Sequence, residues 1–386
     1  MLIDDKRIAI VGGGPGGLTL ARLLQIKGAD VKVYERDLNK DVRVQGATLD
    51  LHTESGLKAL EMAGLLDAFK ENYRPGADKI RVVDNNGVIF FDEHIQEKEG
   101  DFGDDYFRPE IDRGPLRHIL LGSLQPGTVV WDSQFLTMSP VGGGWQLGFK
   151  NGTTAMADIV TAADGANSKI RPFITPIMPF YTGVTALEGS VYDAATAVPR
   201  INELLKGGKI FAFGGGKCLI VSAKGDGSLA FYTSRMKEEG WVKDSGIDFT
   251  DKAQVLNWFR QDFAEWGSLW NELFEQAQVP FVPRPIYSMP LNQAWSAQPN
   301  LTMLGDAAHL MPPFAGEGVN MAMLDALELS ECLTDEQFLN VRSAIAAYEE
   351  RMRVRAAEAA RESLENGEWM HAEGAMGRMV EMPGQS

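Results

Sequence analysis

The sequence predicts an α/β protein that has a parallel sheet near its N-terminus, an inserted antiparallel sheet and a long C-terminal helix. The first observation is a strand-like run at 7–11 that leads through a glycine-rich turn into a helical pattern at 18–26. Between 176 and 290, short runs alternate between apolar and polar residues, which is typical of antiparallel strands with one covered face. A highly charged segment at 335–367 then has the spacing of one long helix, with a break near 338–343.

Local patterns predict the elements between these landmarks. Residues 53–70 carry apolar side chains at helical spacing and are expected to form one helix. Two hairpins are expected, at 79–95 around Asn85-Asn86-Gly87 and at 131–149 around Gly142-Gly143-Gly144, because such turns join neighbouring antiparallel strands.

The composition restricts the partners of the protein. The chain has 386 residues, a formal net charge of −16 and a pI of about 4.8. Such an acidic protein repels the phosphates of nucleic acids and anionic membrane surfaces, so we expect neither as a partner. Two cysteines, Cys218 and Cys332, are expected to be reduced thiols, and no leader-like segment opens the sequence, so we expect a cytoplasmic protein. A monomer fits these observations, and the oligomeric state is left open.

The glycine-rich turn has the pattern G-x-G-x-x-G, formed by Gly12, Gly14 and Gly17. In such a turn the first glycine permits the tight bend, the second lets a pyrophosphate approach the backbone, and the third lets helix and strand pack closely. Glu35 ends the second strand and is followed by Arg36, where a carboxylate can accept hydrogen bonds from ribose hydroxyls. The pattern predicts a Rossmann-like dinucleotide site, and the alternative is a tight turn that binds no ligand.

Two later segments distinguish FAD from NAD. One is Ala163-Asp164-Gly165-Ala166-Asn167-Ser168-Lys169-Ile170-Arg171, and the other runs from Leu304-Gly305-Asp306 to Asn320. In this order after the glycine motif, they resemble the characteristic segments of the FAD-dependent aromatic hydroxylases related to p-hydroxybenzoate hydroxylase. The resemblance covers residues 7–330. Gly46-Ala47-Thr48-Leu49-Asp50-Leu51-His52, together with the second segment, looks like the flavin monooxygenases that inactivate tetracyclines.

The resemblance implies roles for individual charged residues. Asp306 would bind the ribityl or pyrophosphate part of FAD, and Asp50 and Arg113 would also contact FAD. Arg43 would lie near the approach of NADPH. Asp164 matches a motif that is connected, in the larger hydroxylase group, with both FAD and NADPH.

The second segment also fits a flavin by its chemistry. Asp306 follows a buried strand, so its carboxylate emerges where ligands bind in such sheets, and the alternative is a helix N-cap. Gly316 and Gly318 open a helix whose first residues include Val319 and Asn320. The positive end of that helix would stabilise an anionic reduced flavin.

The chemistry would take place on the flavin, so no side chain is assigned as catalytic. Pro313 and Gly316 are expected to shape the flavin site, since proline stiffens the loop before the helix. His309 is expected to orient this loop or to pack under the flavin, and a general-base role is the alternative. The histidines show no metal-binding spacing, so no metal is expected.

The inserted region departs from the tetracycline-inactivating enzymes at three places. Lys209 stands where a substrate-binding arginine is expected, Glu188 where a glutamine is expected, and Ala230 where a histidine is expected. Unpaired polar groups of a bound ligand would each cost about 1–3 kcal/mol. This difference argues against tetracycline itself as the native substrate.

Aromatic side chains in the same region offer a face for a flat ring substrate. They include Phe211 and Phe231, and the loop residues Pro313 and Phe314 would lie opposite them. The alternative is that some of the aromatic residues belong to the core of the sheet.

The predicted division of the chain has four parts. These are an FAD-binding domain over 1–175 and 291–335, a substrate-binding domain over 176–290, and a bridging helix and tail over 336–386.

The resemblance implies a monooxygenase that hydroxylates a small aromatic or polyketide-like compound, with a tetracycline-like antibiotic among the candidates. In the cycle of such enzymes, NADPH or NADH reduces FAD, the reduced flavin captures dioxygen as a C4a-hydroperoxide, and the distal oxygen passes to a nucleophilic carbon. Two alternatives stay open. One is a flavin-dependent dehydrogenase, oxidase or reductase on the same scaffold, and the other is a non-enzymatic binding protein of the GDI type.

Overall fold

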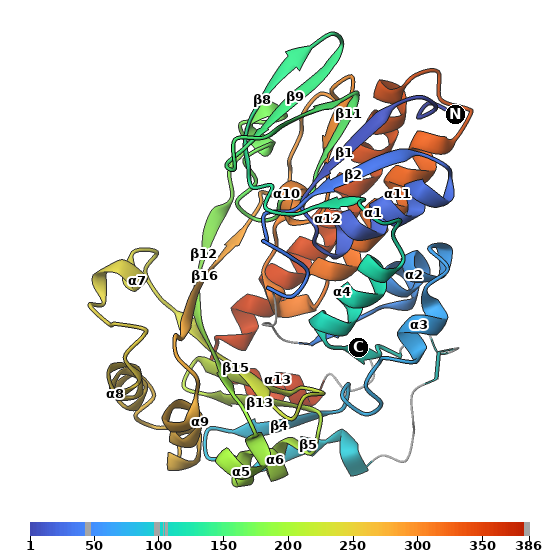
Figure 1. Ribbon diagram of the computed structural model, residues 1–386. Helices are drawn as coiled ribbons and strands as arrows, with labels where there is room; N and C mark the ends of the chain where they lie inside the picture. Colours follow the sequence, from blue (N-terminus) through green and yellow to red (C-terminus); the bar gives the residue numbers. More distant parts are fainter. Residues whose placement is uncertain (43–47, 96–100, 103, 105–106, 382–386) are drawn as a thin grey trace.

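The predicted α/β fold is confirmed by the computed structural model, which describes residues 1–42, 48–95, 101–102, 104 and 107–381. A parallel sheet with its helices lies at one end of the molecule, and a larger sheet lies at the other end (Figure 1). The long helix α12 runs between these two parts (Figure 1).

Within the described residues, a five-stranded parallel sheet forms the centre of the nucleotide-binding part, in the order β17-β11-β1-β2-β7. Its strands are β1 (Arg7–Val11), β2 (Asp30–Tyr34), β7 (Val129–Val130), β11 (Ile159–Ala162) and β17 (Leu301–Met303). Strands β11 and β17 are buried along their whole length. Continuous apolar strands of this kind are typical of a parallel sheet that is covered on both faces.

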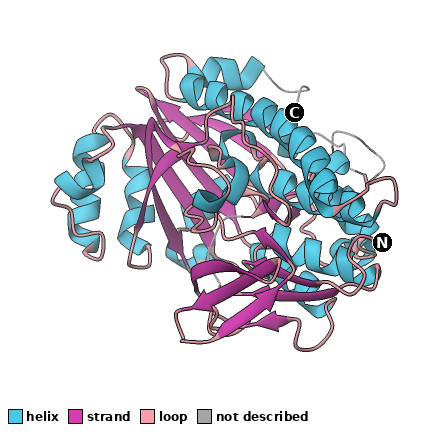
Figure 2. Ribbon diagram, turned by 90° about the horizontal axis from the view of Figure 1, so that it is seen from above, coloured by secondary structure: helices cyan, strands magenta, loops and turns pink. Residues whose placement is uncertain are grey.

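Helices cover one face of the parallel sheet, and a small antiparallel sheet covers the other (Figure 1, Figure 2). The covering elements are the helices α1 (Pro15–Ile26), α11 (Gly318–Thr334) and α12 (Val341–Met370) and the strands β8 (Phe135–Val141), β9 (Gly144–Phe149) and β10 (Thr154–Ala157). The ring of Phe149 stacks on Tyr34 of β2 with 4.8 Å between the ring centroids. The small sheet therefore contributes to the same apolar core as the parallel sheet.

Shorter elements connect these layers. They are β3 (Leu49–Asp50), the π-helical turn η1 (Thr53–Leu57), α2 (Lys58–Met62), α3 (Leu66–Lys70), β6 (Glu110–Ile111), α4 (Arg113–Gly122), η3 (Arg171–Phe173), α10 (Asp306–His309) and η5 (Pro313–Ala315). The prediction of one helix over 53–70 was wrong. Three short elements occupy this range, because Gly64 follows α2 with a φ of 67° and ends the helical path.

A seven-stranded sheet forms the second part, in the order β16-β12-β15-β14-β13-β4-β5 among the described strands. Its strands are β4 (Ile80–Asp84), β5 (Ile89–Asp92), β12 (Phe180–Val191), β13 (Lys209–Gly214), β14 (Lys217–Ala223), β15 (Leu229–Met236) and β16 (Val282–Ser288). Neighbours are antiparallel except β4 and β13, which are parallel. The sheet takes β4 and β5 from before residue 175, so the predicted boundary there does not separate the two sheets.

Among the described residues, several helices form a layer on one face of the seven-stranded sheet. They are α5 (Ala194–Ala197), α6 (Pro199–Leu205), α8 (Lys252–Asp262) and α9 (Asn271–Gln276), with η2 (Glu93–Ile95), η4 (Ser268–Trp270) and α7 (Trp241–Asp244) at the margins. The opposite face turns toward the parallel sheet and α12 (Figure 1).

Helix α12 contacts both parts of the molecule. Near its start, Glu349 accepts a hydrogen bond from Thr302 Oγ1 of β17 at 2.8 Å. Farther along, Ser363 Oγ donates to the carbonyl of Pro312 at 2.5 Å. Just after the helix, His371 Nε2 and Ser234 Oγ of β15 form a hydrogen bond of 2.8 Å. The short helix α13 (Ala375–Glu381) follows and packs against β4 and β13.

Candidate functional site

Three strands of the parallel sheet end side by side. Val11 pairs with Ala162, and Ala162 pairs with Met303, so the segments that follow β1, β11 and β17 emerge at one edge. The carboxyl edge of a parallel sheet is where ligands bind in folds of this class. The glycine motif and the segments that begin at Ala163 and Leu304 therefore meet there.

The three glycines of the motif differ in what surrounds them. A Cβ atom at Gly12 would overlap the carbonyl oxygen of Ala163, and a Cβ at Gly17 would overlap the carbonyl oxygen of Gly12. The position of a Cβ on Gly14 has no atom within 4 Å. Packing within the protein requires Gly12 and Gly17, whereas Gly14 leaves a cradle at the start of α1 that a side chain would fill. This cradle fits a pyrophosphate on the N-terminus of α1.

Glu35 is fixed beside this cradle. Its side chain is buried, and it accepts hydrogen bonds from the backbone N–H of Gly13 at 2.6 Å and of Asp37 at 3.0 Å. These bonds hold the carboxylate at the end of β2, where such folds recognise a ribose. The neighbouring Arg36 is exposed.

Asp306 begins α10 on the same edge. Gly305 holds the N-cap position with a φ of 58°, so Asp306 is the first helical residue and not the N-cap. The residue is exposed to solvent, although protein surrounds its carboxyl group. Burial raises the pKa of Asp306, and the positive charges of His309, Arg113 and Arg171 lower it by a smaller amount. Arg113, the first residue of α4, is thus one of the cations whose charge acts on Asp306.

Arg171 and Asp164 organise the loop after β11. Arg171 is buried and donates to the carbonyls of Ala307 at 2.7 Å and Asp306 at 2.9 Å, and burial lowers its pKa. Asp164 Oδ2 accepts from the backbone N–H of Lys169 at 2.9 Å, and burial raises the pKa of this carboxyl. The Asp164 segment therefore holds α10, and with it Asp306, against the sheet edge.

His309 has a partner that the sequence did not identify. Its Nε2 atom lies 2.5 Å from Asp325 Oδ2 of α11, and the same oxygen accepts from the backbone N–H of Gly305 at 2.9 Å. Arg355 of α12 donates to the other oxygen of Asp325 at 2.7 Å. This arrangement supports the orienting role that was expected for His309. The signal in the sequence was a lone aspartate within the apolar face of α11.

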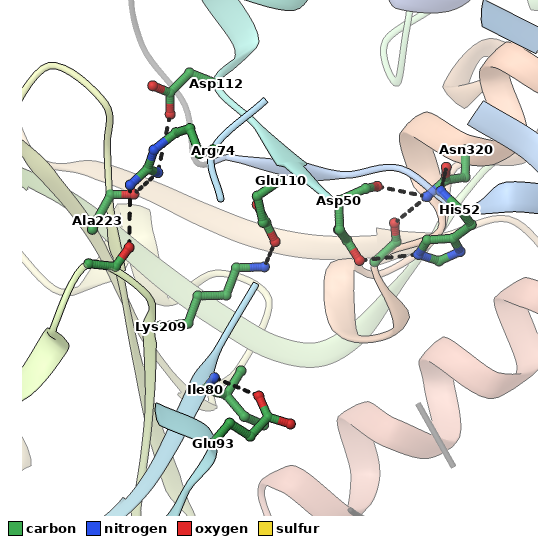
Figure 3. A network of polar contacts seen from close by, with 12 residues as sticks. Asp50, His52, Arg74, Ile80, Glu93, Glu110, Asp112, Lys209, Ala223 and Asn320 are labelled. Atoms are coloured by element: carbon green, nitrogen blue, oxygen red, sulfur yellow. Dashed lines mark hydrogen bonds and ion pairs between the residues drawn. The ribbon is translucent and has the colours of Figure 1, made fainter. Parts of the chain in front are cut away.

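A second cluster of charges lies under the loop that leads into α11 (Figure 3). His52 is placed between two carboxylates, with Nε2 at 3.1 Å from Asp50 Oδ2 and Nδ1 at 3.1 Å from Glu317 Oε1. Burial alone would lower the pKa of His52, but the two carboxylates raise it to about 9. Burial alone would raise the pKa of Asp50, but His52 and the charge of Lys209 hold it at about 2.

Asn320 joins this cluster to α11. Its Oδ1 accepts from the backbone N–H of His52 at 3.0 Å, and its Nδ2 donates to the carbonyls of Asp50 at 3.0 Å and Gly316 at 3.4 Å. Asn320 is among the predicted cofactor-binding residues, and its side chain holds the backbone of the segment at 50–52 and of Gly316. A Cβ at Gly316 would lie 3.0 Å from Asp50 Oδ2, so the lack of a side chain at this position leaves room for the carboxylate of Asp50. Gly318 and Val319 form the first turn of α11 beside it.

Lys209 crosses from the large sheet to the nucleotide-binding part (Figure 3). It forms an ion pair with Glu110 of β6, whose backbone pairs with Asp50 of β3. Burial alone would lower the pKa of Lys209, but Glu110 and Asp50 raise it. Lys209 is therefore a charged link between the two parts, and Glu110 is a partner that sequence reasoning missed.

The register of the large sheet decides which aromatic side chains face the nucleotide-binding part. Phe211 pairs with Ile220, Ile220 with Tyr232, and Tyr232 with Glu188, so these four side chains share one face. Phe231, one residue from Tyr232, lies on the opposite face because side chains alternate along a strand.

The assignment of Phe231 to the substrate face was wrong. Its side chain has no exposed surface, and its ring lies 5.2 Å from that of Phe274, among the helices behind the sheet. Glu188 lies on the predicted face but pairs with Arg284 at 2.8 Å.

The loop at 312–314 meets the large sheet and α12. Phe314 packs in one cluster with Phe211, and Asn366 Nδ2 of α12 donates to the carbonyl of Phe314 at 3.1 Å. Pro313 is exposed at the start of η5. Arg43 lies outside the described residues.

Two absences can be stated for the part of the chain that the structure covers. No helix in it has both the length and the apolar composition to cross a membrane. No cluster of His, Cys, Asp and Glu side chains in it could hold a metal ion.

The fold and the site define a dinucleotide-binding α/β protein with an opposed antiparallel sheet. A family model described as "FAD binding domain" matches residues 5–104 and 148–363. The chain belongs to this family, and the predicted resemblance to the FAD-dependent aromatic hydroxylases is confirmed. The cradle at Gly14 and the carboxylate of Asp306 fit the pyrophosphate and ribityl groups of FAD.

Named relatives and solved structures agree with this class. The relative "Monooxygenase asqM" from Emericella nidulans is 29% identical, over 88% of this chain and 86% of the relative. HpxO from Klebsiella pneumoniae, solved with FAD and uric acid, has a TM-score of 0.75 at 20% identity over 97% of this chain and 92% of that chain. Tetracycline destructase Tet(51) has a TM-score of 0.72 at 17% identity over 97% and 94%. The enzyme class that these findings support is an FAD-dependent monooxygenase.

Proposed function

We propose that this enzyme uses NADPH or NADH as electron donor and hydroxylates a small aromatic or polyketide-like compound. The observation that carries the proposal is the face formed by Phe211, Ile220 and Tyr232, on which Phe211 and Ile220 share a cluster with Phe314 of the loop and with residues of α13. A flat apolar ring fits such a face, because aromatic side chains bind planar groups by stacking and edge contacts. When bound, FAD supplies the redox chemistry and the activation of dioxygen.

The residues of the chain have binding and orienting tasks in this proposal. Asp306 and Arg113 hold the ribityl and pyrophosphate part of FAD, and Glu35 holds the ribose. The N-terminus of α11, at Gly318, offers backbone N–H groups to the electron-rich side of the flavin ring. The aromatic face and Phe314 exclude water from the reacting atoms, which strengthens electrostatic interactions there.

A tetracycline-like antibiotic is less well supported as the substrate. At two of the three places where this chain departs from the tetracycline-inactivating enzymes, the charged side chain has a partner within the protein. Lys209 pairs with Glu110, and Glu188 pairs with Arg284. Binding a polar ligand through either residue would require breaking an ion pair, with the loss of stabilisation that follows when one partner is left buried.

The proposal includes a cytoplasmic location, which the two free, buried cysteines support, and no nucleic-acid partner, which the net charge of −16 supports. The oligomeric state is not part of it.

The test is oxidation of NADPH and NADH by the FAD-loaded protein, with and without a panel of phenols, pyridinols, anthraquinones and tetracyclines. We expect one aromatic compound to stimulate oxidation and to gain an oxygen atom from ¹⁸O-labelled dioxygen. Stimulated oxidation of the nucleotide with peroxide as the only oxygen product would favour the oxidase or dehydrogenase alternative. Failure to bind FAD at all would leave the GDI-type alternative.

A further inference from the structure

A small cavity lies beside the end of α10. It has a volume of about 10 Å³ and is enclosed by α10, by α12 and by the segment at 289–293. Most of its lining is apolar, and three polar residues contribute to it, namely Gln293, His309 and Arg353.

Each of these residues has one buried polar atom without a hydrogen-bond partner among the described residues. The atoms are Oε1 of Gln293, Nδ1 of His309 and Nη1 of Arg353. Other atoms of the same side chains are engaged. Gln293 Nε2 donates to the carbonyl of Ala308 at 3.2 Å, and His309 Nε2 is bonded to Asp325. These bonds hold Gln293 and His309 in place, and the guanidinium of Arg353 lies 4.9 Å from the ring centroid of Trp295, with Nη1 at 3.9 Å from Glu349 Oε2.

We propose that one buried water molecule occupies this cavity and bonds to all three atoms. The water would accept hydrogen bonds from His309 Nδ1 and Arg353 Nη1 and donate one to Gln293 Oε1. Buried waters make about three hydrogen bonds, and about 10–15 Å³ of such space holds one. Two donors and one acceptor match the capacity of a water. A halide would be repelled by Gln293 Oε1.

The position of the water gives it a structural task. It joins α10, which carries Asp306, to α12 and to the segment at 289–293. Asp325 and Arg355 make a direct connection between α10 and α12, and the water adds a second one from the other ring nitrogen of His309. The two contacts together fix the ring of His309 and the short helix to which it belongs. The proposal does not depend on the substrate or on the electron donor.

A crystal structure of the FAD-loaded protein at about 1.5 Å resolution tests the proposal directly. We expect an electron-density peak within hydrogen-bond distance of the three atoms, about 2.7–3.2 Å. A map without such a peak would overturn it. A bromide soak separates water from a halide, because an anomalous peak at the same place would also overturn it.

A pair of variants tests the effect on stability. Gln293→Met keeps the length of the side chain and removes both the acceptor and the Nε2 donor to Ala308, whereas Asn292→Leu removes an amide from the neighbouring, exposed position. We expect Gln293→Met to raise the equilibrium constant for unfolding about a hundredfold, because two buried hydrogen bonds are lost, the one to Ala308 and the one to the water. Asn292→Leu should change that constant less than about twofold. Equal effects of the two substitutions would contradict the proposal.

Discussion

At the scale of single residues, the charged groups at the carboxyl edge of the parallel sheet are of two kinds, those that can bind a ligand and those that hold other residues in place. Asp306 is accessible at the edge and suited to a ligand, whereas Asp325, Arg171 and Arg355 are bonded within the protein and hold α10. Sequence patterns identified Asp306 among these groups but gave no role to Asp325 or Arg355. Their surroundings separate those that bind from those that position.

Substitutions at two glycines of the motif should have different effects, one on FAD binding and the other on stability. Gly14→Val should leave the fold intact, because no atom lies within 4 Å of its Cβ position, and should block the pyrophosphate of FAD. Gly17→Ala should destabilise the protein, because its Cβ would overlap the carbonyl of Gly12. Circular dichroism and FAD titration of both variants check this prediction. A folded Gly14→Val protein with unchanged FAD affinity would contradict it.

The pair of carboxylates around His52 predicts how stability depends on pH. The pKa of His52 is about 9 in the folded protein, above the ordinary value of 6.5 that applies to the unfolded chain. Folding therefore favours the protonated form. The stabilisation is fully present below pH 6.5 and is lost as the pH rises through 9. Its size is at most about 3 kcal/mol.

Urea denaturation of the wild type and of His52→Gln between pH 6 and 10 measures this contribution. The difference in unfolding free energy between the two proteins should shrink as the pH rises through that range. A difference that stays constant would show that the charge of His52 does not stabilise the fold.

At the scale of elements, the register of the large sheet determines which side chains can reach a substrate. Phe211 and Phe231 look alike in the sequence, yet they lie on opposite faces, because the pairing runs from Phe211 through Ile220 to Tyr232. Gly189 lies opposite Phe231, and a Cβ there would overlap the phenylalanine ring. A glycine within a strand was thus the available signal that a large side chain covers the backbone on that face.

Substitutions on the two faces should have different consequences. Phe231→Leu is expected to lower the free energy of unfolding by about 1–2 kcal/mol, because it leaves a gap in the core behind the sheet. It should leave the KM for the aromatic substrate unchanged. Phe211→Leu should raise that KM with a smaller loss of stability, since its side chain is only partly buried. A higher KM for Phe231→Leu alone would contradict the assignment of faces.

The elements that were predicted correctly have local causes. The glycine turn, the two hairpins and α12 follow from neighbouring residues, and the edge position of Asp306 follows from the strand before it. The pairs Lys209–Glu110 and His309–Asp325 could not be predicted, because each joins segments that only the folded chain brings together. The division of 53–70 into three elements was also not predicted, because Gly64 ends the helical path although the apolar residues on both sides of it keep a helical spacing.

At the scale of the whole molecule, α12 and Lys209 connect the two sheets. Helix α12 bonds to β17, to the loop at 312–314 and, through His371, to β15. The cofactor edge and the aromatic face are therefore held in one arrangement before any ligand binds. Preorganisation of this kind lowers the free-energy cost of ordering a site when its ligand arrives.

The central claim is that FAD binds at the shared edge of β1, β11 and β17, which carries both Gly14 and Asp306. The most direct test is a titration of the purified protein, freed of flavin, with FAD, followed by flavin fluorescence and by the absorbance spectrum. The wild type should bind one FAD per chain, and Asp306→Ala should bind it at least about tenfold more weakly, as expected when a charged hydrogen-bonding group is lost. Equal FAD affinity of the two proteins, or no binding by the folded wild type, would contradict the account.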